Sequence, residues 1–132
     1  MDPVEALADC IMQFEGWSLS SRSWRNRNPG NLRPYNPSQQ KDEGGYRVFQ
    51  SLDEGWDALK LDLESKFGGS HNLTPQSHMI DLFNIYAPAG DANNPSAYTT
   101  FVCERVTKIL GRTITPITTL EVFLGKVPNN VT

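Results

Sequence analysis

The sequence predicts an α+β fold in a single domain, residues 1–132, that is mainly helical with a small β-hairpin after the first helix. Two observations lead to this prediction. Apolar residues recur at helical spacing in five segments, and capping residues, glycine or proline bound each segment. Residues 17–50 differ, because they are rich in Ser, Arg, Asn, Pro and Gly and hold two short extended pieces.

The first helix is expected to begin at Asp2 and to stop at Gly16. Asp2 can cap the helix, Pro3 suits its first turn, and Glu5 completes a capping-box pattern. Four further helices are expected from similar capping and breaking signals. The ring of Pro88 forces the second of these four to end. Their ranges are 51–68, 74–88, 94–111 and 118–125.

The hairpin is expected between the first and second helices. Its strands would be Asn31–Arg33 and Tyr46–Phe49, and the polar run 36–43 followed by Gly44–Gly45 would form a long tip. The chain contains no internal repeat and no linker long enough to divide it. One domain with a helical body and a small β element is therefore predicted.

Composition limits the classes of partner. The formal net charge of −3 argues against nucleic acid. No apolar run approaches the roughly 20 residues of a membrane span, and the N-terminus lacks a secretory signal. Synthesis in the cytoplasm and a monomeric protein are expected.

Cysteine and histidine give no sign of a metal site. Cys10 and Cys103 fall inside helical patterns and are expected to be buried, with a disulfide between them left open. His71 and His78 have no carboxylate or thiol at metal-ligand spacing. Neither a metal nor another cofactor is expected.

Glu15 is the unusual residue of the first helix. It lies on the apolar side, one turn after Ile11, and at the helix end its carboxylate would face the negative end of the macrodipole. Both features disfavour ionisation, so its pKa should be raised, as a glycosidase acid requires. The alternative is a Glu exposed at a frayed helix end.

Four motifs together resemble a family of small phage-type lysozymes, which belongs with goose-type lysozymes and soluble lytic transglycosylases to the lysozyme-like superfamily. They are residues 14–17 (Phe-Glu-Gly-Trp), 25–33 (which includes Asn-Pro-Gly-Asn), 45–49 and 86–88. The resemblance covers about residues 4 to 110. It implies a lysozyme-like fold, peptidoglycan as substrate, and Glu15 as the catalytic acid.

Five side chains are candidates for binding the sugar. A tight turn at residues 28–31 could present the Asn31 amide to sugar groups, or it could simply begin the first strand. The resemblance points to Tyr86, whose hydroxyl would bond the catalytic Glu or line the cleft; the alternative is a core aromatic. Exposed aromatic rings can stack on sugars. The candidates are Trp24, Asn31, Arg33, Tyr35 and Tyr86.

The second catalytic carboxylate is not identified by the sequence. Hydrolysis requires a second carboxylate, at roughly 5 Å from the acid when the stereochemistry at the anomeric carbon is retained and at roughly 6.5–9.5 Å when it is inverted. Asp42, Glu43, Asp53 and Asp91 are candidates, but each has a simpler structural explanation. A muramidase is therefore expected, while a lytic transglycosylase or an inactive wall-binding or phage structural module stays open. The cleft should lie between the first helix, the hairpin and the 86–94 loop, and the enzyme would reach the wall after release or export.

Overall fold

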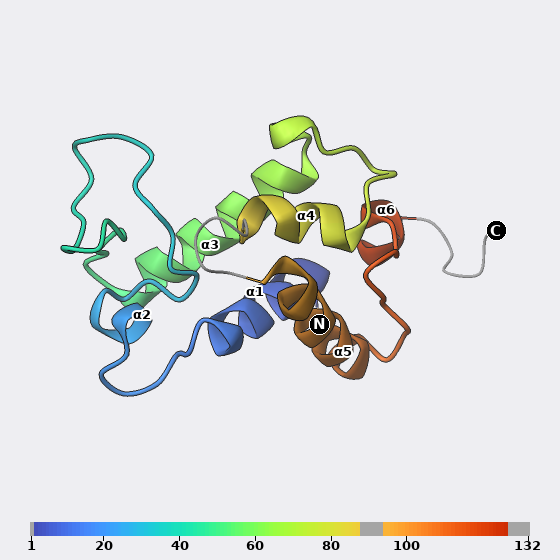
Figure 1. Cartoon of the computed structure of the whole chain (residues 1–132), viewed down its shortest axis with the longest axis horizontal. Helices are drawn as coiled ribbons and strands as arrows, with labels where there is room; N and C mark the ends of the chain where they lie inside the picture. Colours follow the sequence, from blue (N-terminus) through green and yellow to red (C-terminus); the bar gives the residue numbers. More distant parts are fainter. Residues whose placement is uncertain (1, 88–93, 127–132) are drawn as a thin grey trace.

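The computed structural model describes residues 2–87 and 94–126, and these form helices joined by irregular loops (Figure 1). A long loop, residues 26–51, projects from one side of the helical body, and the C-terminal helix lies at the opposite side (Figure 1). The elements are α1 (Pro3–Phe14), α2 (Arg22–Arg25), α3 (Leu52–Phe67), the 3-10 helix η1 (Ser70–Asn72), α4 (Met79–Tyr86), α5 (Pro95–Leu110) and α6 (Leu120–Phe123).

The core forms around α1, which packs against α5 and α3, while α4 packs against α5. Leu7 and Ile11 of α1 are fully buried, as are Leu63 of α3 and Val102 of α5. Burying such apolar side chains drives the helices together. No helix within residues 2–87 and 94–126 is long and apolar enough to cross a membrane.

Local signals predicted the long helices well. Ser51 caps α3 by accepting a hydrogen bond from Glu54 N (3.2 Å), and Asn94 caps α5 in the same way. Gly16 follows α1 with a φ of +81°, a conformation that glycine adopts without strain. Asp2 occupies the predicted N-cap position of α1, but the predicted capping is wrong, because its side chain makes no capping hydrogen bond.

Three helical details were predicted incorrectly or missed. The helix expected from residue 74 begins at Met79, because a turn at 74–77 precedes it and Asp81 accepts a hydrogen bond from His78 N (2.7 Å). The last helix is a single turn, Leu120–Phe123. The short α2 and η1 were not predicted, and Pro88 lies outside the described residues.

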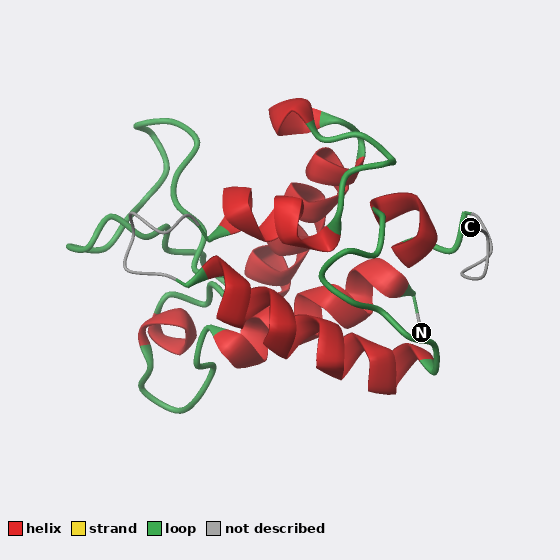
Figure 2. Cartoon of the chain, turned by 45° about the vertical axis from the view of Figure 1, so that its right-hand side comes forward, coloured by secondary structure: helices red, strands yellow, loops and turns green. Residues whose placement is uncertain are grey.

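The α+β class and the β-hairpin are wrong. The described residues contain no strand, only isolated bridges at Lys41–Arg47 and His78–Thr119 (Figure 2). The buried Asn28 side chain explains this locally. Its amide donates to the carbonyls of Leu32 and Arg47, and its oxygen accepts from Leu32 N, each at 2.9 Å. Arg47 N donates to Leu32 O (2.9 Å), so one backbone hydrogen bond joins the two segments, but the Asn28 side chain takes Leu32 N and Arg47 O, which a continued ladder would pair.

Asn28→Asp is expected to destabilise the protein by about 3 kcal/mol, because it removes two buried donors and leaves two carbonyls facing a carboxylate. The free energy of unfolding in urea measures the effect. Asn36→Asp, on the exposed part of the same loop, is the control and should change stability little. Equal stability of the Asn28 variant and the wild type would contradict this role for Asn28.

Candidate functional site

Glu15 is placed by the end of α1. Its N–H still donates to Ile11 O (2.8 Å), but the helix stops there and Gly16 turns the chain away. The Glu15 side chain therefore extends from the last turn of a buried helix. Ile11, one turn earlier, is fully buried, so the helix itself is firmly anchored.

Two uncharged donors hold the Glu15 carboxyl group. Asn31 Nδ2 donates to Oε1 (3.1 Å), and the Tyr98 hydroxyl donates to Oε2 (2.8 Å). Within the described residues Glu15 makes no ion pair. Burial raises the pKa of Glu15, and the hydrogen bonds from Asn31 and Tyr98 only partly oppose the rise. The sequence prediction of a raised pKa agrees with this geometry.

A groove of about 330 Å³ opens beside Glu15. Its walls come from the end of α1, the loop after Asn28, and the facing sides of α3 and α4. Four of the five predicted binding residues line it. The lining residues are Glu15, Gly30, Asn31, Leu32, Arg33, Pro34, Tyr35, Tyr46, Asp62, Lys66, His71, Ile85, Tyr86 and Ala87.

Asn31 is held at Glu15 by a tight turn. Asn31 N donates to Asn28 O (3.0 Å), which confirms the turn predicted at residues 28–31. Asn31 has a φ of +47°, a left-handed conformation that asparagine tolerates better than most residues. Its Oδ1 atom is buried and has no hydrogen-bond partner in the described part of the chain. A buried acceptor without a partner thus lies on the side chain that bonds Glu15.

The two tyrosines of the site have different partners. Tyr86 lines the groove, but its hydroxyl donates to Gly30 O (2.8 Å) rather than to Glu15. Tyr98 of α5, which the sequence analysis did not select, bonds Glu15 instead. Tyr98 is fully buried and stacks on Phe14 with ring centroids 3.9 Å apart. In the sequence, Tyr98 belongs to the apolar stripe of its helix, which indicates core packing and does not point to Glu15.

A nearly buried ion pair forms another part of the groove and was also missed. Lys66 Nζ lies 2.6 Å from Oδ2 of Asp62, and their side chains are 7% and 11% exposed. The Tyr35 hydroxyl donates to Oδ1 of Asp62 (3.0 Å), so both carboxylate oxygens are occupied. Burial raises the pKa of Tyr35 to about 12. In the sequence, this pair resembles an ordinary exposed i,i+4 contact on a helix.

Three of the carboxylates considered as the second catalytic group, Asp42, Glu43 and Asp53, do not line the groove. Asp42 accepts hydrogen bonds from Asn26 Nδ2 and from the backbone of Gly44 and Tyr46, which lower its pKa. Glu43 and Asp53 are exposed, and neither lines the groove. Asp91 lies outside the described residues.

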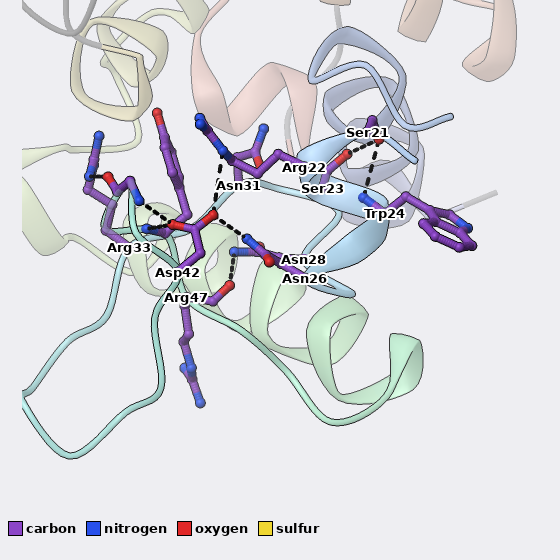
Figure 3. Close-up of polar contacts among 12 residues, drawn as sticks. Ser21, Arg22, Ser23, Trp24, Asn26, Asn28, Asn31, Arg33, Asp42 and Arg47 are labelled. Carbon is purple, nitrogen blue, oxygen red and sulfur yellow. Dashed lines mark hydrogen bonds and ion pairs between the residues drawn. The ribbon is translucent and has the colours of Figure 1, made fainter. Parts of the chain in front are cut away.

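Trp24 is exposed, as predicted, but it is not among the residues that line the groove. Figure 3 shows its ring directed away from Asn31 and Arg33. The structure therefore gives Trp24 no place in the site formed around Glu15.

The cysteines and histidines form no centre of their own. Cys10 and Cys103 are buried free thiols, and burial raises their pKa values to about 11 and about 12. Of the two histidines, His71 lines the groove and His78 does not. Among the residues described, no three His, Cys, Asp or Glu side chains gather closely enough to hold a metal ion.

The chain matches no protein-family model, and no curated protein or solved structure is similar to it. The comparisons therefore provide no support for the lysozyme-like fold that the motifs implied. Assignment of an activity rests on the residues around Glu15.

Tyr98→Phe is expected to move the pKa of Glu15 further upward, because the lost hydroxyl favours the ionised carboxylate. If Glu15 acts as an acid, the alkaline limb of the pH–rate profile moves to higher pH. Carbon NMR titration of the Glu15 carboxyl group measures the same shift directly.

Tyr86→Phe is the matched control for this titration. It removes a hydroxyl that bonds Gly30 O and leaves both hydrogen bonds of Glu15 in place. The Glu15 titration should therefore change little in this variant. A downward shift in Tyr98→Phe, or equal shifts in both variants, would contradict the assigned hydrogen bond.

Proposed function

We propose that this protein cleaves the β-1,4 bond between N-acetylmuramic acid and N-acetylglucosamine in peptidoglycan, with Glu15 as the proton donor. The observation that carries the proposal is a carboxyl group of raised pKa on an open groove, held only by neutral donors. Such a group keeps its proton to a higher pH than an exposed Glu does and can give it to a glycosidic oxygen. The lysozyme-type motifs around Glu15, Asn31 and Tyr86 favour peptidoglycan as the substrate.

The groove offers groups that suit a glycan chain. Its lining combines neutral hydrogen-bonding groups with aromatic rings, notably Asn31, Tyr35 and Tyr86. Hydroxyl and amide groups of this kind can form hydrogen bonds with the hydroxyl and acetamido groups of a sugar. Placement of the sugar beside Glu15 would supply the proximity that proton transfer needs.

Lytic transglycosylase activity is a second candidate, and Asp62 favours it. Asp62 is the second carboxylate among the residues known to line the groove, and Lys66 and Tyr35 occupy both of its oxygens. It is therefore poorly placed to activate water. In transglycosylation, Glu15 protonates the leaving oxygen, and its carboxylate then accepts the proton of the muramic acid O6 hydroxyl. O6 attacks C1 and forms an anhydro ring without consuming water.

An inactive wall-binding or structural module is less favoured by the site. Such a module would be supported by a Glu15 paired with an arginine and enclosed away from a groove. Glu15 instead lines a groove and makes no ion pair within the described residues.

Purified protein added to isolated bacterial walls tests the proposal. Falling turbidity and release of disaccharide-containing fragments are expected, and unchanged walls would overturn it. Mass analysis separates the two activities, since an anhydro product lacks the one water that a hydrolytic product gains. We further propose that the enzyme, made in the cytoplasm, acts on the wall after release or export.

A further inference from the structure

A second polar feature lies at the groove, around the ring of Tyr46. The guanidinium carbons of Arg22 and Arg33 lie 4.5 and 4.3 Å from the centre of this ring. Both distances are within the range of cation–π contacts, which fix an arginine without neutralising it. Tyr46 and Arg33 both line the groove, so this cationic cluster of Arg22, Arg33 and Tyr46 reaches the site of Glu15.

The cluster carries more positive than negative charge. Arg22 Nε lies 3.5 Å from Oδ2 of Asp42, whose carboxylate also accepts several hydrogen bonds from the loop (Figure 3). Arg33 has no carboxylate within ion-pair distance in the part of the chain that the structure describes. Its Nη1 donates only to Gly44 O, at 3.3 Å. Arg33 is exposed and therefore accessible to an anion.

Two glycines allow the arginines to lie against the loop backbone. A Cβ at Gly45 would lie 3.0 Å from Arg33 Nη1, and one at Gly44 would lie 3.3 Å from Arg22 Nη2. Gly45 also has a φ of +87°, which disfavours other residues. The guanidinium groups are thus held in place by ring and backbone before any ligand arrives, which reduces the ordering cost of binding.

We infer that Arg33, supported by Tyr46 and Arg22, binds a carboxylate carried by the muramic acid side of the glycan. The inference rests on the proposed function and deepens it. A guanidinium group matches a carboxylate in a bidentate geometry. The sugar hydroxyls and acetamido groups are neutral, so the carboxylate must come from the lactyl group or from the peptide stem attached to it.

Binding by Glu15→Gln protein, which should not turn its ligand over, tests the inference with three probes. One disaccharide carries a free lactyl carboxylate, one carries the peptide stem, and chitobiose carries neither. Calorimetry should show that Arg33→Gln, made in this background, weakens binding of a carboxylate-bearing probe about tenfold or more and leaves chitobiose binding unchanged. The probe that loses affinity identifies the carboxylate.

Arg47→Gln is the matched control. Arg47 lies in the same loop and stacks on Phe49, with 4.3 Å from its guanidinium carbon to the ring centre, but it does not line the groove. Its side chain extends away from Asp42 and Arg33 (Figure 3). Arg33→Lys should retain part of the affinity, because lysine keeps the positive charge but cannot form the bidentate pair of hydrogen bonds.

An equal loss of affinity for all three probes in the Arg33→Gln variant, or no loss for any of them, would overturn the inference. Wall cleavage by the wild type would then still support the proposed function. Absence of wall cleavage would overturn the proposed function, whereas these binding measurements would still report on Arg33. Absence of binding to all three probes would overturn the inference.

Discussion

Glu15→Gln is expected to lower the rate of peptidoglycan cleavage about 10³-fold or more, because the amide cannot supply a proton to the glycosidic oxygen. The substitution preserves the shape of the site. The Gln oxygen can still accept from Asn31 Nδ2, and its amide can donate to the Tyr98 hydroxyl oxygen. Loss of activity would therefore report lost chemistry rather than a rearranged groove.

Release of soluble fragments from purified walls measures this effect, and circular dichroism verifies the fold. Asp53→Asn is the matched control, since it also converts a carboxylate to an amide, in the exposed first turn of α3. Its activity should equal that of the wild type. Comparable cleavage by Glu15→Gln and the wild type would rule out Glu15 as the acid.

The pH dependence follows from the same proton. Burial raises the pKa of Glu15, so the carboxyl group stays protonated above the pH at which an exposed Glu ionises. Wild-type activity should fall as the pH rises through this raised pKa. The direction is opposite to that of a carboxylate base, whose activity would fall toward acid pH.

The helices could be predicted because their signals are local. Ser51 and Asn94 cap the helices that follow them, and glycine ends α1 and α5. Glu15 was selected as the catalytic acid by the resemblance of the surrounding motifs to phage-type lysozymes, while its helix position and apolar spacing, both within one segment, predicted only a raised pKa. Burial, which the apolar spacing predicted, is the feature that raises this pKa in the structure.

The loop and the partners of Glu15 could not be predicted because they depend on distant contacts. The segments 31–33 and 46–49 have strand-like sequences, yet the buried Asn28 amide bonds Leu32 N and Arg47 O, which would otherwise pair with each other. Tyr98 is 83 residues from Glu15 in the chain. A helical Tyr or an i,i+4 pair such as Asp62 and Lys66 carries no sequence signal of a groove.

Gly55→Ala is expected to destabilise the protein by about 3 kcal/mol, although alanine favours a helix over glycine by about 1 kcal/mol. The reason is a close approach of α3 to the loop that leads to Asn31. A Cβ at Gly55 would lie 1.9 Å from the Arg27 carbonyl oxygen and 3.0 Å from Pro29 Cδ. Because the first contact is with backbone, either the helix or the loop must move.

The free energy of unfolding in urea measures the cost, and Gly68→Ala provides the control. Gly68 is exposed at the end of α3 with a φ of −81°, so its substitution should change stability by less than about 1 kcal/mol. Movement of the loop in Gly55→Ala would also displace Asn31 from Glu15, so wall cleavage should fall together with stability. A Gly55→Ala protein as stable and active as the wild type would show that α3 does not fix this loop, and with it the geometry around Glu15.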